Sequence, residues 1–169
     1  LAADAFLGKG SVTISEFVSG SPSLCAVADF ARIHLDRRLT HGETRESALR
    51  EVEELVPEGA RVEVRDYLVR SYTGLEYGME KYYPTWVLPE DHALVRTGAE
   101  VHQALFGAEP KIDKWTFSTN AVTINGLYGI PTVGFGPGNE VLAHAPNEKT
   151  PIDQLVMAAA FYALFACTI

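Results

Sequence analysis

The sequence has few cysteines, a deficit of basic residues and no hydrophobic run long enough to cross a bilayer. Cys25 and Cys167 lie far apart and neither belongs to a C-x-x-C motif, so the sequence predicts neither a disulfide framework nor a thiolate zinc site. The net charge of −8, from 22 acidic and 14 basic residues, argues against a nucleic-acid surface, which requires clustered lysines and arginines. The apolar run Leu155–Ile169 carries no charge, but its length of about 15 residues falls short of the roughly 20 that span a membrane. We expect it to form a buried closing helix.

A secretory leader is also missing from the sequence. The first residue is leucine, and no basic segment followed by an apolar one precedes the rest of the chain. Together with the low cysteine content, this favours a reduced, cytoplasmic location. At 169 residues, the chain can bury one good core or two small ones.

The first half of the chain, residues 1–80, predicts a small α+β domain. Alternating apolar residues indicate strands, and apolar residues at helical spacing indicate a helix. In chain order we expect the end of a helix at 1–9, strands from Gly10 and over Cys25–Leu39, a helix over Thr44–Leu55 and a strand over Ala60–Tyr72. The alternation slips once in the second strand, which indicates a bulge. These elements favour a two-layer unit with its helices on one face of a sheet.

The second half, residues 81–169, alternates helix and strand signals after an aperiodic connection over Tyr72–Pro89. We expect helices over Glu90–Phe106 and from Thr119-Asn120 to Leu127, strands over Lys111–Thr116 and Gly129–Phe135, and a last helix that opens at Thr150-Pro151. This alternation is typical of a layered α/β domain. Two strands are few for a sheet that is covered on both faces.

The segment Gly134–Glu148 reads G-F-G-P-G-N-E-V-L-A-H-A-P-N-E and is the strongest candidate for a functional site. Its glycines and Pro137 let the backbone turn sharply and come close to a ligand. His144 follows on a stiff segment, with Glu148 four positions later. A metal-binding histidine uses a nearby carboxylate to accept its other ring N–H. From spacing alone, His144 is either a metal ligand or an ordinary loop residue.

Several motifs resemble those of one enzyme family. They are L-D-R-R at Leu35, K-W-T-F-S-T-N at Lys114, G-I-P-T-V-G-F-G-P-G at Gly129 and A-H-A-P-N-E-K at Ala143. In combination they resemble the co-catalytic zinc aminohydrolases and metallopeptidases, which include aminoacylase, acetylornithine deacetylase, succinyl-diaminopimelate desuccinylase and glutamate carboxypeptidase. The chain is most similar to the selenium-metabolism hydrolase branch. The resemblance implies a lid or dimerisation domain over residues 1–80 and the C-terminal portion of a layered α/β catalytic domain over residues 81–169.

The resemblance also implies a metal centre. Family members bind two zinc ions, for which cobalt or manganese can substitute, through five side chains, and a glutamate acts as general base on a bridging water. His144 matches the last histidine ligand, and Glu148 is placed to orient it. The other ligands and the general base belong to the first half of the family's catalytic domain, which has no counterpart in this sequence. We therefore expect these 169 residues alone to be inactive and to bind metal weakly, because one ligand cannot hold a catalytic zinc tightly.

Three positions match substrate contacts of the family. Arg38 matches an arginine that grips the substrate carboxylate, and Gly136 matches a glycine that lines the substrate pocket. Asn120 stands where the family has an aspartate, so helix capping is its alternative role. From the residues alone, Arg38 can equally be a solvated charge at a strand end, and Gly136 a plain turn glycine.

The sequence thus predicts a zinc-dependent hydrolase of amide bonds that acts on a small N-acyl amino acid or peptide. We expect a homodimer formed through the lid domain, with no nucleic-acid or membrane partner. The alternatives are a non-catalytic dimerisation fragment and a small-molecule binding module that uses the glycine loop.

Overall fold

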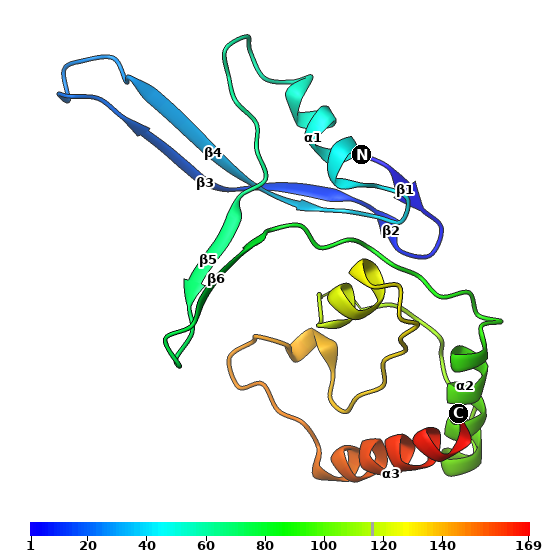
Figure 1. Cartoon of the computed structure of the whole chain (residues 1–169). Helices are drawn as coiled ribbons and strands as arrows, with labels where there is room; N and C mark the ends of the chain where they lie inside the picture. Colours follow the sequence, from blue (N-terminus) through cyan, green and yellow to red (C-terminus); the bar gives the residue numbers. More distant parts are fainter. Residues whose placement is uncertain (116) are drawn as a thin grey trace. The chain divides into compact units, whose positions relative to one another are not determined.

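The computed structural model describes residues 1–115 and 117–169 (Figure 1). The chain forms two compact units, Leu1–Thr85 and Trp86–Ile169. Strands and helices are both present, and the strands pair in antiparallel fashion. The predicted mixed α+β fold class is therefore confirmed.

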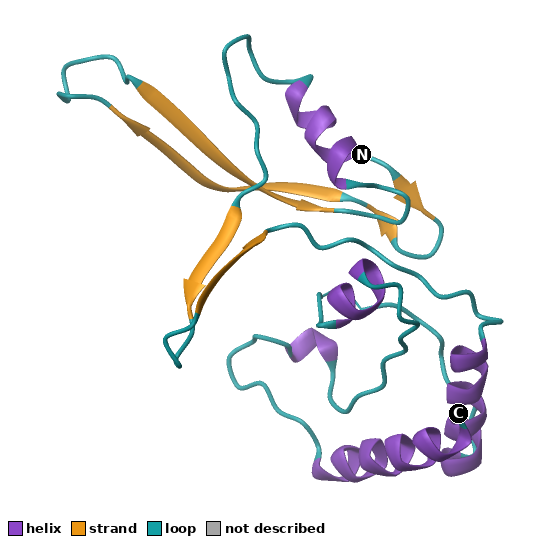
Figure 2. Cartoon of the chain, in the orientation of Figure 1, coloured by secondary structure: helices purple, strands orange, loops and turns teal. Residues whose placement is uncertain are grey.

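The first unit contains three separate two-stranded sheets and one helix (Figure 2). Its elements are β1 (Ala3–Asp4), β2 (Gly8–Lys9), β3 (Ser11–Gly20), β4 (Phe30–Arg38), α1 (Arg45–Glu53), β5 (Asp66–Arg70) and β6 (Glu76–Glu80). Strand β1 pairs with β2, β3 with β4, and β5 with β6. The strands thus pair only with their neighbours in sequence, rather than joining into the single sheet that the alternation favoured.

The long ribbon formed by β3 and β4 has one apolar face. Ile14 pairs with Leu35 and Phe17 pairs with Ile33, and the register shifts between Ile14 and Glu16. Because the shift adds one residue to β3, Ile14 and Phe17 lie on the same face despite their odd spacing. The bulge is therefore in β3, and its predicted place in the second strand was wrong. This face is exposed, with Ile14 at 63% and Phe17 at 66% of their full accessibility.

Three other local predictions in this unit were wrong. Residues 1–9 form the β1–β2 hairpin rather than the end of a helix, because Asp4 Oδ1 accepts hydrogen bonds from the backbone N–H groups of Phe6 and Leu7 at 2.8 and 2.7 Å and closes a turn. Strand β4 begins at Phe30 rather than at Cys25, and β5 begins at Asp66 rather than at Ala60. Strand β6 was missed, since it lies within the segment interpreted as a connection.

Helix α1 begins as predicted and is joined to β4 by charged side chains. Thr44 Oγ1 accepts from the Ser47 N–H at 3.2 Å, and Ser47 Oγ accepts from the Thr44 N–H at 2.9 Å. This reciprocal capping box fixes the first turn. Arg37 of β4 forms ion pairs with Glu43, in the loop before the helix, and at 2.9 Å with Glu51 of α1. Arg37 and Glu43 are 11% and 6% exposed, so this cluster ties the helix to the ribbon.

The second unit contains α2 (Ala93–Phe106), a π-helical turn η1 (Val122–Leu127), a 3-10 turn η2 (Glu140–Leu142) and α3 (Ile152–Thr168). Helices α2 and α3 pack against each other. The buried apolar side chains of the unit are Val101, Ala158 and Phe161. Gly98 of α2 faces the rings of Phe161 and Phe165, and a Cβ atom there would lie in ordinary van der Waals contact with both, at 3.8 Å.

The two strands predicted for this unit are not formed. Residues 111–115 and 129–135 are irregular, and Thr116, the end of the first predicted strand, lies outside the described residues. An apolar run such as Ile130–Val133 becomes a strand only when another strand edge is available to pair with it. The described residues of this unit supply no such edge.

The last helix was predicted correctly at its start but not in its burial. Pro151 occupies the N-cap position and Asp153 lies in the first turn of α3. Only Ala158 and Phe161 of this helix are buried, whereas Leu155 and Val156 are 50% and 65% exposed. Among the residues described, no helix is both long enough and apolar enough to traverse a bilayer.

Candidate functional site

The glycine loop starts from an aromatic cluster on α2 and α3. Phe135 stacks on Phe161 of α3 with ring centroids 4.1 Å apart, and it also neighbours His102 and Phe106 of α2 at 6.0 and 6.3 Å. The Tyr162 hydroxyl donates to the Phe135 carbonyl and accepts from the Phe135 N–H at 3.3 Å. Ring packing and backbone hydrogen bonds therefore hold the start of the loop in place.

Gly134 is required by the side chain that covers it. A Cβ atom at this position would lie closer than 3.0 Å to the indole ring of Trp115. Trp115 in turn stacks on Phe117, with ring centroids 5.7 Å apart. At Gly136, by contrast, a Cβ atom would meet nothing within 4 Å. The two glycines thus differ: the first accommodates a ring and the second borders open space.

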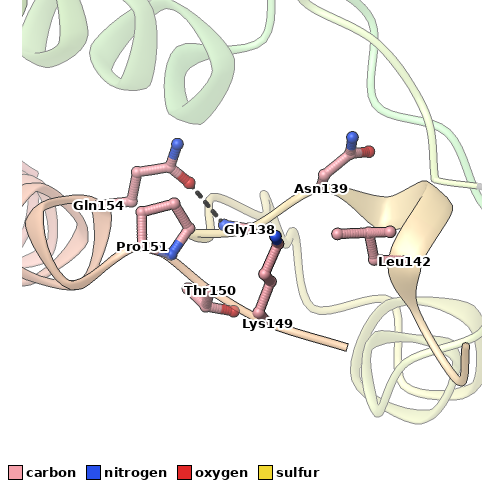
Figure 3. A pocket seen from close by; sticks show the side chains of 7 residues that line it. All are labelled: Gly138, Asn139, Leu142, Lys149, Thr150, Pro151 and Gln154. Atoms are coloured by element: carbon pink, nitrogen blue, oxygen red, sulfur yellow. Dashed lines mark hydrogen bonds between the residues drawn. The ribbon is translucent and has the colours of Figure 1, made fainter. Parts of the chain in front are cut away.

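Gly138 ends the turn and binds the first part of α3. Its φ of +97° is a left-handed conformation that favours glycine, and a Cβ atom would lie 3.1 Å from Thr150 Oγ1. The Gly138 N–H donates to Gln154 Oε1 at 2.8 Å (Figure 3). Asn139 then caps η2 by accepting the Val141 N–H on its Oδ1 at 3.0 Å. The path of the loop is therefore fixed on both sides of the turn.

His144 is exposed and sits on a backbone that side chains rarely adopt. His144 and Asn147 have φ values of 61° and 64°. Left-handed conformations at non-glycine residues cost roughly 1–2 kcal/mol and cluster at functional sites. Glu148 Oε2 accepts the backbone N–H of His144 at 3.1 Å. The Glu148 carboxylate thus holds the His144 backbone, and its expected role beside the imidazole stays a prediction.

The described residues can supply one ligand of a metal centre, but they do not supply a complete set of ligands. His144 presents an exposed imidazole on a loop that is fixed by hydrogen bonds. In the part of the chain that the structure describes, no group of three or more His, Cys, Asp or Glu side chains is placed to hold a metal ion. A catalytic zinc needs about three protein ligands. His144 can therefore act only together with ligands from elsewhere.

Two shallow pockets lie where the loop meets α3. The first, here called the Gly136 pocket, has a volume of about 210 Å³ and is lined by Phe135, Gly136, Pro137, Asp153, Gln154 and Met157. The second, the Lys149 pocket, has a volume of about 240 Å³ and is lined by Gly138, Asn139, Leu142, Lys149, Thr150, Pro151 and Gln154 (Figure 3). Gln154 borders both. Gly136 thus lines a pocket, as the resemblance implied, although its contact with substrate stays a prediction.

Arg38 and Asn120 are not among the residues that line these pockets. Arg38 ends β4 in the other unit and is exposed, and its guanidinium binds Asp36 through two contacts of 2.9 Å. Asn120 is exposed and acts through its backbone carbonyl, which accepts the Thr123 and Ile124 N–H groups at 3.0 and 3.2 Å. The Thr119 Oγ1 atom accepts the Ala121 N–H at 3.2 Å, and Ala121, the N-cap residue of η1, makes no side-chain capping hydrogen bond. Capping by the Asn120 side chain was therefore wrong.

Sequence reasoning missed the polar side chains of the Lys149 pocket. Asn139 and Gln154 are separated by 15 positions, but their carbonyl oxygens accept backbone N–H groups at the two ends of the same turn. The available signal was the sequence Lys149-Thr150-Pro151 at the start of the last helix, which places polar residues beside the returning loop.

Comparison with known proteins agrees with the motifs. Residues 8–168 match the model of peptidase family M20/M25/M40. The chain is 52% identical over 163 residues to a protein of Escherichia coli strain K12 named "Uncharacterized protein YgeY", and the protein of the same name from Escherichia coli O157:H7 matches equally. Each match covers 95% of this chain and 40% of the relative. The chain thus spans about two-fifths of the length of these relatives.

The family match covers nearly every residue, and the predicted His144 motif and glycine loop lie within it. On these grounds the chain belongs to peptidase family M20/M25/M40.

Proposed function

We propose that the complete natural protein is a zinc-dependent hydrolase of amide bonds in small N-acyl amino acids or peptides. Within the family we place it beside the selenium-metabolism hydrolases, on the strength of its H-A-P-N-E and L-D-R-R motifs. The observation that carries the proposal is the strained, exposed His144 on a loop that is bound to α3 at its glycine turn. Strain at an exposed histidine is costly for a plain loop and is expected where the side chain must point in one direction.

The residues of this chain have separate tasks in this proposal. His144 supplies one metal ligand, and Glu148 keeps the His144 backbone in its left-handed conformation through the 3.1 Å hydrogen bond. Gly136 leaves room for substrate, because no atom approaches its missing side chain within 4 Å. The Arg38 guanidinium binds a substrate carboxylate after its N–H groups release the carboxylate of Asp36. The exposed Arg38–Asp36 pair opposes this exchange only weakly.

The zinc ions, when bound, supply a water of lowered pKa and polarise the scissile carbonyl. We place the remaining ligands and the general base outside these 169 residues, because the described residues form no group of three or more metal-ligating side chains. The 169 residues, taken alone, are expected to be inactive. The same proposal assigns residues 1–80 to a lid domain and residues 81–169 to part of a catalytic domain.

The test is metal content and hydrolysis in the complete natural protein. We expect His144→Ala to lose about one of the two zinc ions and to lower kcat/KM for N-acetyl amino acids or dipeptides by at least about 100-fold. Glu148→Gln, which weakens the support of the loop, should lower activity by roughly tenfold. His41→Ala is the matched control, since His41 is an exposed histidine of the first unit. Full zinc content and activity in His144→Ala would overturn the assignment.

We further propose that the protein forms a homodimer through the exposed apolar face of the β3–β4 ribbon. Ile14, Phe17 and Ile33 lie on this face and are 63%, 66% and 50% exposed. Exposed apolar faces of this kind mark interaction sites. The non-catalytic alternative, a fragment that only dimerises, draws on the same observation.

Light scattering and sedimentation of the complete protein test this interface. Phe17→Thr should weaken the dimer by at least about tenfold, because large apolar side chains at an interface contribute most of its affinity. Glu16→Gln is the control, since its partner in the register is His34 on the polar face of the ribbon. A strict monomer in the wild-type protein, or a dimer that Phe17→Thr leaves intact, would contradict the proposal.

A further inference from the structure

The Lys149 pocket carries a set of hydrogen-bond donors that the loop itself does not use. The oxygen of each amide side chain is occupied, because Gln154 Oε1 accepts the Gly138 N–H at 2.8 Å and Asn139 Oδ1 accepts the Val141 N–H at 3.0 Å. The two amide nitrogens are consequently left to donate to a ligand. In the view of Figure 3, Lys149 extends toward Gly138 with these amides on either side.

The charge of the pocket is positive. Lys149 is the charged residue of its lining, and among the described residues no carboxylate forms an ion pair with it. Glu140, Glu148 and Asp153 neighbour the lining residues in sequence, but none of them lines this pocket. Glu148 accepts the His144 N–H, and Asp153 lines the Gly136 pocket. One ammonium and two amide donors suit an acceptor with a single negative charge and two oxygens.

The pocket is also built rather than incidental. Gly138 at φ +97° brings its backbone against Thr150, and a Cβ atom there would lie 3.1 Å from Thr150 Oγ1. Because any side chain at position 138 would intrude on this wall, the turn and the pocket depend on the same glycine. The volume of about 240 Å³ has room for a small acid.

We propose that the Lys149 pocket binds the carboxylate of a small organic acid. The Lys149 ammonium and the amide groups of Asn139 and Gln154 donate to the carboxylate oxygens. Arg38 is not among the residues that line this pocket, and its guanidinium is paired with Asp36. That the bound carboxylate is part of the substrate rests on the proposed hydrolase function, whereas binding itself does not.

Heteronuclear NMR titration of the complete natural protein with sodium acetate tests the proposal at constant ionic strength, maintained with sodium chloride. We expect saturable shifts of the Gly138 amide and of the Asn139 and Gln154 side-chain amides, with a dissociation constant on the order of millimolar, as suits so small a ligand. Lys149→Met should weaken binding by about tenfold, because it removes a charge-assisted hydrogen bond at an exposed site. Lys149→Arg should keep most of the affinity.

Lys111→Met is the matched control, since Lys111 is an exposed lysine of the same unit that pairs with Asp113. It should bind acetate as the wild type does. Equal affinity in wild type and Lys149→Met, or the same shifts with chloride alone, would overturn the proposal. Inorganic phosphate should bind more weakly than acetate, and tighter phosphate binding would refute the assignment to a carboxylate.

The outcome separates this inference from the proposed function. Loss of acetate binding in Lys149→Met with normal zinc content supports the pocket and leaves the metal ligand standing. Absence of acetate binding in the wild type removes the pocket but not the role of His144. Normal acetate binding in a protein whose zinc does not depend on His144 would remove the proposed function but not the pocket.

Discussion

Replacing Gly134 with alanine tests how the glycine loop is held. The added Cβ atom would lie closer than 3.0 Å to the six-membered part of the Trp115 indole, so either the ring or the backbone must move. Overpacking of this kind costs about 1–3 kcal/mol. Because Trp115 is 45% exposed, the ring can partly swing outward, and we expect a loss near the lower end, about 1–2 kcal/mol.

A double-mutant cycle identifies the clash as the cause. Trp115→Ala alone should cost roughly 1–2 kcal/mol, since it removes a half-exposed ring and its stacking on Phe117. In Gly134→Ala/Trp115→Ala the obstacle is gone, so the double variant should be more stable than the sum of the single losses predicts by about 1 kcal/mol or more. Urea unfolding followed by far-UV circular dichroism measures all three variants.

Gly136→Ala is the matched control in the same loop. No atom lies within 4 Å of its added Cβ, and Gly136 has no positive φ. Its substitution should be neutral or slightly stabilising, by up to about 1 kcal/mol, because alanine restricts the unfolded chain. Single losses that add within about 0.5 kcal/mol, or equal losses at Gly134 and Gly136, would refute the reasoning.

Three further predictions concern the first unit and the loop anchor. Although burial acts to raise the pKa of Glu43, hydrogen bonds from the Thr40 N–H and Arg37 lower it, and the hydrogen bond from Arg37 lowers the pKa of Glu51. These depressed values stabilise the folded state above the ordinary glutamate pKa of about 4.3, and the stabilisation is lost as the pH falls through the lower folded values. Arg37→Met should therefore cost about 2 kcal/mol at neutral pH, discounted because Glu51 is 39% exposed, and should flatten the acid limb of a stability-against-pH curve; an unchanged limb would contradict the ion-pair account. Thr44→Ala should cost about 1 kcal/mol by removing the N-cap of α1, which urea unfolding measures, and a loss below about 0.3 kcal/mol would mean that the cap is unimportant. Tyr162→Phe should cost about 1 kcal/mol and broaden the Phe135 amide resonance, and a sharp, unshifted resonance would show that the hydroxyl does not hold the loop.

Local sequence signals predicted most helix ends, although α2 begins at Ala93 rather than at Glu90. The Thr44 cap, the glycine that ends α2 at position 107 and the Pro151 entry to α3 all lie where the sequence placed helix ends. Each signal acts within one or two turns of the chain, through hydrogen bonds that the neighbouring residues provide themselves. Such features can be predicted from a short window of sequence.

Strands were harder, because a strand depends on a partner that the sequence does not identify. The apolar run Ile130–Val133 has strand character but meets no free edge among the described residues. Conversely, β6 formed opposite β5 in a segment without clear alternation, since the turn at Ser71 and Gly74 brings the two halves together. The bulge in β3 likewise emerges only from the pairing with β4.

Of the candidate site, the sequence predicted only the residues that belong to recognisable motifs. His144 and Gly136 were found from the glycine loop and the family resemblance, whereas the hydrogen bond from the His144 backbone to Glu148 depends on the left-handed turn at Asn147. The side-chain amide donors of Asn139 and Gln154 were missed. Their nitrogens are identified as donors only because backbone N–H groups already bind their amide oxygens. That information is available only from coordinates.

The most direct test of the account is the position of the metal in crystals of the complete natural protein, located by anomalous diffraction at the zinc absorption edge. The account predicts an anomalous peak about 2.0–2.1 Å from an imidazole nitrogen of His144. A zinc ion bound elsewhere, with the His144 side chain turned away from it, would contradict the central claim.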